Sequence, residues 1–185
     1  MNDYPNLLEK IHDLQRKNKT LIIGIDGVGG AGKTTLATYL KDHLPNADIV
    51  QMDDFYSPEL GMPDKARLMN EVLKPLALDL ASVYQVYNWS NDSLDQPITI
   101  QPGGIVIVEG VFSLHSDLIS YYDFRIWVDC LPDIGFARGV ARDLARDGVD
   151  NSDKWINIWM PKEKAYHQSQ NPQQYADYIV KENQF

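Results

Sequence analysis

The chain of 185 residues has little cysteine, no long hydrophobic run and no excess of positive charge. Cys130 is the only cysteine, so an internal disulfide cannot form, and we expect a reducing compartment with this residue buried at a strand end. No apolar stretch is long enough to cross a membrane, and the first residues include acidic ones, unlike a signal peptide. These features predict a cytoplasmic protein without a membrane partner.

The charge balance excludes a further class of partner. Lys and Arg number 17 against 26 Asp and Glu, which gives a formal net charge of -9. Because capture of nucleic acid requires a basic surface, we expect no nucleic-acid partner, although a local site can still hold a small anion. With 44% hydrophobic residues, the length suits a single domain over residues 1–185. The sequence leaves open whether the chain forms a homo-oligomer.

A glycine-rich loop follows the first strong strand pattern. The β-branched run Leu21 to Ile25 predicts a buried strand, and residues from Thr34 to Leu40 have helical spacing. The loop between them matches G-x-x-x-x-G-K-[ST], a pattern whose backbone N–H groups can surround a polyphosphate because no Cβ intrudes. We expect Lys33 to reach the β- and γ-phosphates and the Thr34 hydroxyl to bind Mg²⁺. The predicted nucleotide-binding residues are Gly27, Gly29, Gly30, Ala31, Gly32, Lys33, Thr34 and Thr35.

Acidic residues end two further predicted strands. Residues 47–52 lead into Asp53 and Asp54, and since neighbours on an extended chain point opposite ways, we expect one of these carboxylates to face the site. The alternative is a solvated acidic turn. Residues 105–108 are a buried-strand pattern that ends in Glu109 and Gly110, as a Walker B strand does. A buried acid is costly to leave unpaired, so Glu109 is predicted to hold Mg²⁺ directly or through water.

Aromatic residues gather in a predicted hairpin outside the main sheet. Residues 84–89 and 97–101 are β-like and are joined by the polar segment 90–96. We expect Tyr84, Tyr87 and Trp89 to share one face, which either packs on the core or forms a base-stacking pocket.

Three arginines follow one another at steps of four on a helix that begins at about Asp133: Arg138, Arg142 and Arg146. Two readings stay open. The helix is either a surface helix neutralised by Asp143 and Asp147, or an arginine face that closes over the transferring phosphoryl group.

The remaining patterns predict packing elements. They are helices at 6–17, 33–43, 66–76 and 154–167 (interrupted by Pro161), a loop at 57–64, and strands at 124–129 and 175–180. His167 and the other histidines lack metal-site spacing.

Taken in order, these motifs resemble the uridine kinase-like branch of the P-loop kinases, which includes phosphoribulokinase, type I pantothenate kinase and nicotinamide riboside kinase. The resemblance rests on the phosphate loop and on Asp53-Asp54-Phe55-Tyr56, Tyr87-Asn88-Trp89, Glu109-Gly110, residues 137–143 and Tyr175-Ala176-Asp177. It implies an α/β fold with a five-stranded parallel sheet flanked by helices, a lid at about 138–160 and a hairpin over the acceptor site.

The resemblance also implies roles. Asp53 would be the catalytic base, helped by Lys33, Arg142 and Arg138, while Thr34, Asp53 and Glu109 would hold Mg²⁺. The acceptor would meet Asp53, Tyr56, Tyr87, Trp89 and Arg142, with Asp64 as a candidate for the ribose hydroxyls. Two positions depart from the family. Gly139 stands where a second lid arginine is frequent, with Arg138 or Arg146 as its substitute, and Asp92 stands where uridine–cytidine kinases have a histidine.

These expectations describe an ATP- and Mg²⁺-dependent kinase of a small-molecule hydroxyl, with the 5′-hydroxyl of uridine or cytidine expected first. Nicotinamide riboside and pantothenate-like alcohols are alternatives. Two other classes stay open: a regulatory NTPase without a small acceptor, and a nucleotide-binding paralogue without turnover. No Asn-Lys-x-Asp segment is present to read guanine.

Overall fold

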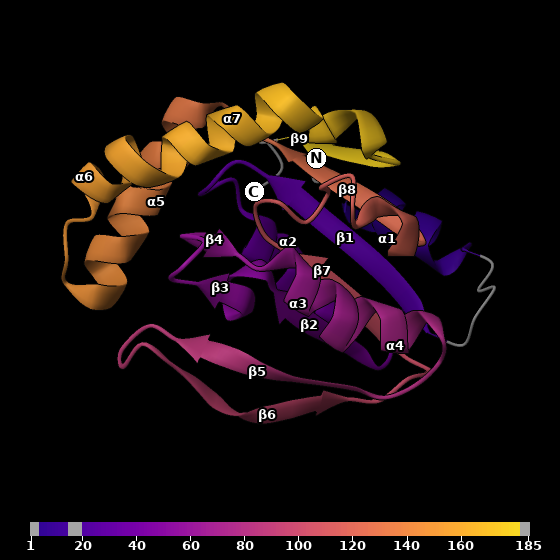
Figure 1. Cartoon of the computed structure of the whole chain (residues 1–185). Coiled ribbons are helices and arrows are strands. Elements are labelled where there is room, and N and C mark those ends of the chain that lie inside the picture. Colours follow the sequence, from indigo (N-terminus) through magenta and orange to yellow (C-terminus); the bar gives the residue numbers. More distant parts are fainter. Residues whose placement is uncertain (1–3, 15–19, 182–185) are drawn as a thin grey trace.

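Five parallel strands form the central sheet, in the order β2-β7-β1-β8-β9 (Figure 1). The computed structural model describes residues 4–14 and 20–181. The strands are β1 (Leu21–Gly27), β2 (Ala47–Gln51), β7 (Ile105–Glu109), β8 (Phe124–Asp129) and β9 (Tyr178–Lys181). Every residue of β1 and β7 is buried, as expected for strands with both faces covered. The predicted parallel sheet is confirmed.

Helices cover both faces of this sheet. On one face, α1 (Tyr4–His12) and α2 (Lys33–His43) pack against Ile23, Ile25 and Ile107. On the other, Ile22 and Val106 meet a helical segment made of α3 (Lys65–Leu68), the π-helical turn Met69–Leu73 and α4 (Lys74–Ala77). The predicted first helix extends too far, since α1 ends at His12, and residues 15–17 of that prediction lie outside the described residues.

Two small antiparallel sheets lie beside the main one. The strands β3 (Tyr56–Ser57) and β4 (Met62–Pro63) form a short hairpin within the segment predicted as a loop. The strands β5 (Ser82–Asn88) and β6 (Ser93–Ile100) form the predicted hairpin outside the main sheet. Its connection is shorter than expected, because β6 already begins at Ser93 within the polar segment. In Figure 1 the β5–β6 hairpin runs along the bottom of the molecule, and β3 and β4 lie to the left of the main sheet.

The last third of the chain arches over the sheet as a series of helices (Figure 1). They are α5 (Pro132–Asp147), α6 (Ser152–Lys154), a π-helical turn (Trp155–Trp159) and α7 (Met160–Gln170). We call these residues, 132–170, the lid segment. Pro161 does not interrupt the helix as predicted, because it lies in the first turn of α7, where a missing N–H costs little. The last strand begins later than predicted, at Tyr178 instead of residue 175, because residues 172–175 form a 3₁₀ turn before β9.

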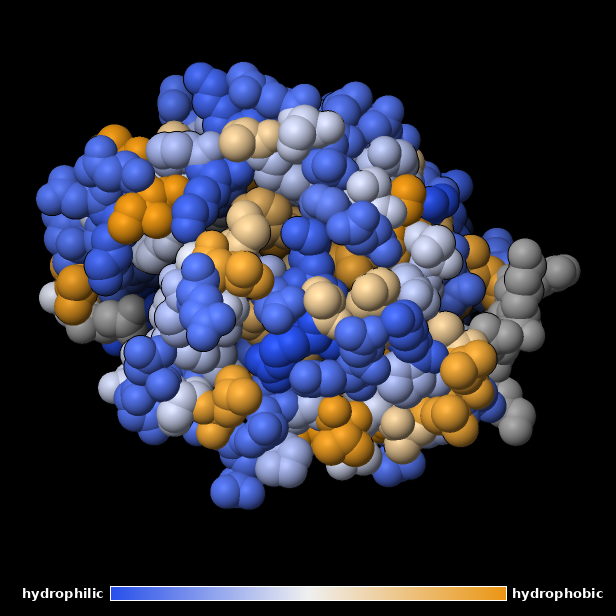
Figure 2. Space-filling view, in the orientation of Figure 1, coloured by the Kyte–Doolittle hydropathy of each residue, from blue (hydrophilic) through white to orange (hydrophobic). Residues whose placement is uncertain are grey.

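The surface carries no single dominant hydrophobic area on the face drawn in Figure 2. Hydrophobic side chains form several small groups separated by polar ones. Within residues 4–14 and 20–181, no helix combines the length and the apolar character needed to cross a lipid bilayer.

The packing of α2 on the sheet yields a test of the core. Leu40 is fully buried in the cluster that joins α2 to the strands, so Leu40→Ala should lower the free energy of unfolding by about 2–5 kcal/mol. Leu78, which is 72% exposed, provides the control, and Leu78→Ala should change it by less than about 0.5 kcal/mol. Urea denaturation measures both variants. Equal effects of the two substitutions would contradict the core assignment.

Candidate active site

The phosphate loop joins β1 to α2 at the carboxyl edge of the sheet. Gly30 and Gly32 have φ angles of 71° and 97°, in the left-handed region that favours glycine. The N-terminal residue of α2 is Lys33, so the free N–H groups of the first helical turn face the loop. The local sequence therefore folds into the anion-binding form that its pattern predicts.

Lys33 and Thr34 lie against neighbouring acceptors of the protein. The ammonium of Lys33 donates hydrogen bonds to the carbonyl oxygens of Gly27 and Val28, at 2.9 and 2.8 Å. The Thr34 hydroxyl donates to a carboxylate oxygen of Glu109 at 2.8 Å. Glu109 is 5% exposed, and burial raises its pKa, while the charge of Lys33 and the Thr34 hydroxyl oppose that rise.

Strand order explains why these residues meet. The strands β2, β7 and β1 are neighbours, and Glu109 is level with both Gln51 and Ile25 in the sheet. The chain beyond β2, the end of β7 and the phosphate loop after β1 therefore share one edge.

Asp53 and Asp54 lie on a 3₁₀ turn (Met52–Phe55), not on the extended chain that the prediction assumed, and their carboxylates have different surroundings. Asp54 turns back on this turn, where its carboxylate accepts from the backbone N–H of Gln51 at 3.3 Å. Asp53 is open to solvent on one side and interacts electrostatically with Lys33, Arg142 and Arg146. Desolvation by the surrounding protein raises the pKa of Asp53, and the three cations oppose the rise.

The arginine helix combines features of both readings left open by the sequence. Asp143 is 2% exposed, and its Oδ1 accepts from the Arg142 guanidinium at 2.8 Å while its Oδ2 accepts from the indole N–H of Trp155 at 2.9 Å. Arg142 is nevertheless 54% exposed and interacts with Asp53 from the lid segment. The charge of Arg146 opposes the rise in the pKa of Asp53 as well.

Trp155 accounts for the glycine at position 139. A Cβ at Gly139 would overlap the indole ring of Trp155, so an arginine could not stand there while this ring packs on α5. Gly135, one turn earlier, approaches the phosphate loop so closely that a Cβ at Gly30 would overlap its carbonyl oxygen. The lid segment and the phosphate loop therefore touch through glycine backbone.

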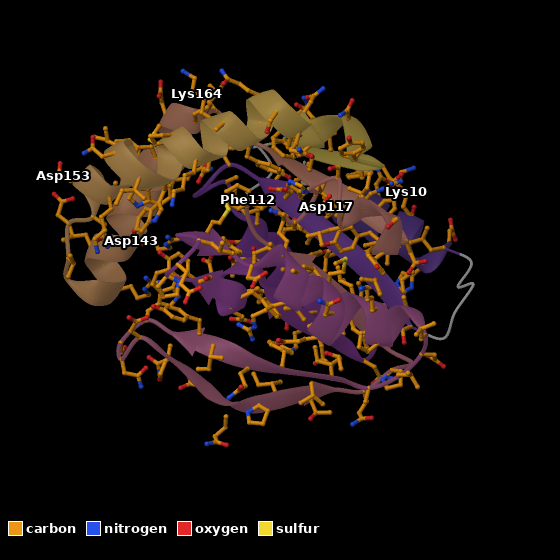
Figure 3. All side chains as sticks on the ribbon, viewed as in Figure 1. Lys10, Phe112, Asp117, Asp143, Asp153 and Lys164 are labelled. Carbon is orange, nitrogen blue, oxygen red and sulfur yellow. The ribbon has the colours of Figure 1, made fainter. Side chains whose placement is uncertain are left out.

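Sequence reasoning missed Asp26, a fully buried carboxylate at the end of β1. Its oxygens accept from the backbone N–H groups of Gly27 at 2.7 Å and Leu114 at 2.9 Å, and from the Tyr166 hydroxyl at 2.7 Å. Phe112, which lies under α7 in Figure 3, contacts the Tyr166 ring at a centroid distance of 4.8 Å. The only signal in the sequence was a charged residue inside an apolar strand.

A second missed residue is Glu163 on α7, whose Oε2 accepts from the backbone N–H of Gly29 at 3.0 Å. The two residues are 134 positions apart, and no local pattern could have linked them. Glu163 brings a carboxylate from the lid segment onto the phosphate loop.

The predicted aromatic residues divide between two environments. Tyr84 stacks on Phe55 at 5.1 Å and is part of the core. Tyr87 and Trp89 both contact Tyr56, at centroid distances of 5.2 and 4.3 Å, and Trp89 is 56% exposed. We call Tyr56, Tyr87 and Trp89 the aromatic cluster.

A bulge places these side chains. Tyr84 and Tyr87 are three residues apart and would face opposite ways on a regular strand, but the pairing of β5 with β6 shifts between Gln85 and Tyr87. The Tyr87 hydroxyl donates to Asp92 at 2.5 Å.

Asp64 has a structural task. Its carboxylate caps α3 by accepting from the N–H groups of Ala66 and Arg67 at 2.9 and 3.1 Å. A role of this carboxylate toward ribose stays a prediction.

The donors around Thr34 suit a hard cation. The hydroxyl of Thr34 and the carboxylate of Glu109 are oxygen ligands in contact with each other, which is what Mg²⁺ prefers. Within the described part of the chain, no group of three or more His, Cys, Asp or Glu side chains could hold a metal by itself. This fits Mg²⁺, which usually takes its remaining ligands from water and substrate phosphates.

Known proteins resemble the chain over almost all of its length. A uridine kinase of Lactobacillus helveticus (strain DPC 4571) is 30% identical over 89% of this chain and 87% of its own. A uridine kinase of Streptococcus uberis is 29% identical, over 90% and 88%. A solved structure described as a possible uridine kinase from Bacillus stearothermophilus has 20% identity and a TM-score of 0.72, over 95% of this chain and 96% of that one.

Fold, phosphate loop and relatives together define the class of the protein as a small-molecule kinase with a P-loop. The sequence profile of the Phosphoribulokinase / Uridine kinase family matches residues 54–184. The chain belongs to this family, and the resemblance stated from its motifs is confirmed.

The buried Asp26 predicts a pH dependence of stability. Burial raises the pKa of Asp26 to about 6, above its ordinary value of 3.8, so the folded state binds more protons than the unfolded state between these values. Its contribution to the free energy of unfolding therefore falls as pH rises from about 4 to about 6, by about 3 kcal/mol at most. Asp26→Asn should remove this fall.

Denaturation of the wild type, Asp26→Asn and a control variant at several pH values between about 4 and 6 measures how the free energy of unfolding changes with pH. Asp42→Asn, at an exposed position on α2, is the control and should keep the wild-type profile. An unchanged slope in Asp26→Asn would contradict the assignment.

Proposed function

We propose that this kinase transfers the γ-phosphoryl group of ATP to the 5′-hydroxyl of a pyrimidine nucleoside, uridine or cytidine. The observation that carries the proposal is the arrangement at the carboxyl edge, where Lys33, Thr34 and Glu109 are in contact with the phosphate loop region and Asp53 interacts with Lys33. The naming of the most similar curated relatives as uridine kinases supports the choice of acceptor.

Each residue has a distinct task in this reaction. Lys33 leaves its loop carbonyls and neutralises charge on the β- and γ-phosphates. Asp53 orients the acceptor hydroxyl and accepts its proton, and a raised pKa makes this carboxylate a better base. Mg²⁺ held by Thr34, Glu109 and Asp53 would supply charge neutralisation at the phosphate oxygens.

The lid segment contributes arginine side chains to the proposed site. Arg142 and Arg146 already interact with Asp53, so they are placed to neutralise charge that develops on the transferring phosphoryl group. Asp143 holds Arg142, and Trp155 holds Asp143, so the guanidinium is positioned by two buried partners.

The aromatic cluster is the proposed base-binding surface. Tyr56 follows Asp53 by three residues and contacts the exposed ring of Trp89 on the hairpin. A planar base can stack on such a ring at a gain of about 1–3 kcal/mol. A nucleoside bound there would have its sugar directed toward Asp53.

The test is ADP release from ATP and Mg²⁺ with a panel of acceptors: uridine, cytidine, deoxycytidine, nicotinamide riboside, pantothenate and adenosine. We expect slow hydrolysis without acceptor and fast transfer with uridine or cytidine. Turnover only with another alcohol of the panel would identify that alcohol as the acceptor and would still support a kinase. Equal ADP release with and without every acceptor would favour a regulatory NTPase.

Asp53→Asn should leave ATP binding within about threefold of wild type and lower kcat by about 10²–10⁴, because the base is lost. Asp54→Asn is the matched control, since that carboxylate faces the backbone of Gln51. Steady-state kinetics together with calorimetric ATP binding measure both variants. Comparable kcat values for the two variants would remove Asp53 from the catalytic role.

Trp89→Ala should raise the KM for the nucleoside by about tenfold and leave the KM for ATP nearly unchanged, because stacking on the base is lost. Val83→Ala, at an exposed position of β5 in the same hairpin, is the control. A selective rise of the KM for ATP would contradict the base-binding surface.

A further inference from the structure

One turn of α7 contacts three parts of the site. The ammonium of Lys162 donates to the carbonyl oxygen of Gly61 in the turn between β3 and β4. Glu163 accepts from the backbone N–H of Gly29, and the Tyr166 hydroxyl donates to Asp26 below the loop. Of these three contacts, the one made by Glu163 uses a loop N–H group, the kind of donor that binds phosphate.

The Glu163 carboxylate lies directly on the loop. A Cβ at Gly29 would come within 2.7 Å of the Glu163 Oε1 and 2.6 Å of the Trp155 ring, so only glycine admits this contact. Trp155 also packs on Gly139, which holds the π-helical turn before α7 against α5. The packing of the lid segment therefore fixes the position of the Glu163 carboxylate on the loop.

Glu163 contacts the loop at Gly29 and is influenced by the charges of two predicted site residues. Lys33 and Asp53 both act on it, the first lowering and the second raising its pKa, while burial raises it most. Asp53 marks the side on which the acceptor is proposed to bind. Gly29 precedes Lys33, the first residue of α2, by four residues, whereas the inner phosphates would be surrounded by backbone N–H groups at the N-terminus of α2. Glu163 thus lies where the outermost phosphate of a triphosphate would arrive.

We propose that Glu163 occupies the place of the γ-phosphate on the loop, so that it disfavours nucleoside triphosphates much more than diphosphates. The inference rests on the proposed function to the extent that the loop binds a nucleotide. Two anions cannot share one N–H donor beside a single lysine without strong repulsion. A diphosphate fits beneath the carboxylate, whereas the third phosphate must displace it and lift α7 from the loop.

This competition gives Glu163 a selective role. Displacing the carboxylate loosens the contact that α7 makes with the loop, and the same lid segment carries Arg142. The γ-phosphate, and not the nucleotide as a whole, would thereby control the position of the lid segment. After transfer, the carboxylate can return to Gly29 while ADP is still bound.

The test compares dissociation constants of ADP and of the non-hydrolysable β,γ-imido analogue of ATP, measured by calorimetry with Mg²⁺ and without acceptor. Glu163→Gln keeps an oxygen acceptor for the Gly29 N–H but removes the charge, and Glu163→Ala removes both. We expect each to tighten the triphosphate analogue by about tenfold or more and ADP by less than about twofold.

Asp153→Asn is the matched control, since it also removes one negative charge from the lid segment, at an exposed position on the outer edge of α6 (Figure 3). It should alter neither constant by more than about twofold.

Three results would overturn the inference. If the variants bound both nucleotides more tightly to the same extent, the effect would come from the overall charge of the protein. If they bound the triphosphate analogue no more tightly than the wild type, Glu163 would not compete with the γ-phosphate. Weaker binding of the analogue would make Glu163 part of the nucleotide site. Failure of the wild type to bind either nucleotide would instead overturn the nucleotide site, and the proposed function with it.

Discussion

The close contact between the phosphate loop and the lid segment is the constraint on which the site depends. Gly29 and Gly30 on the loop meet Gly135, Trp155 and Glu163, and side chains at either glycine would overlap these partners. The loop meets α5 through the backbone of Gly30 and Gly135 and meets α7 through the Glu163 carboxylate, so a movement of either helix changes a contact of the loop. The loop therefore contacts both helices of the lid segment, although it lies more than a hundred residues before Gly135 and Glu163 in the sequence.

The second organising feature is the placement of carboxylates in an acidic protein that must hold an anionic nucleotide. Asp26 and Glu109 are buried and satisfied by hydrogen bonds, the first by two N–H groups and Tyr166, the second by Thr34. Asp143 positions an arginine, and Glu163 covers a loop N–H. Lys33 interacts with Asp26, Asp53, Glu109 and Glu163, so a single ammonium offsets much of the local negative charge.

Much of this arrangement could be predicted from local patterns. The strands β1, β2, β7 and β8 and the loop between β1 and α2 follow from apolar runs and glycine spacing, whereas Asp53 and Asp54 lie on a 3₁₀ turn and not on the extended chain that the sequence suggested. The contacts of Asp26 with Tyr166 and of Glu163 with Gly29 could not be predicted, because they join segments about 140 and 134 residues apart. The same holds for Gly139, whose neighbour Trp155 is identified only by the packing of the lid segment, and for the bulge that brings Tyr87 beside Tyr56.

In the proposed reaction, the γ-phosphoryl group passes from ATP to a nucleoside hydroxyl at the edge formed by Lys33, Asp53 and Glu109. The most direct measurement follows the phosphorus atom itself, with γ-³²P-labelled ATP, Mg²⁺ and uridine or cytidine, and separation of the products by chromatography. We expect the label to move into the nucleoside 5′-monophosphate. Label found in inorganic phosphate alone, with the nucleoside unchanged, would contradict it.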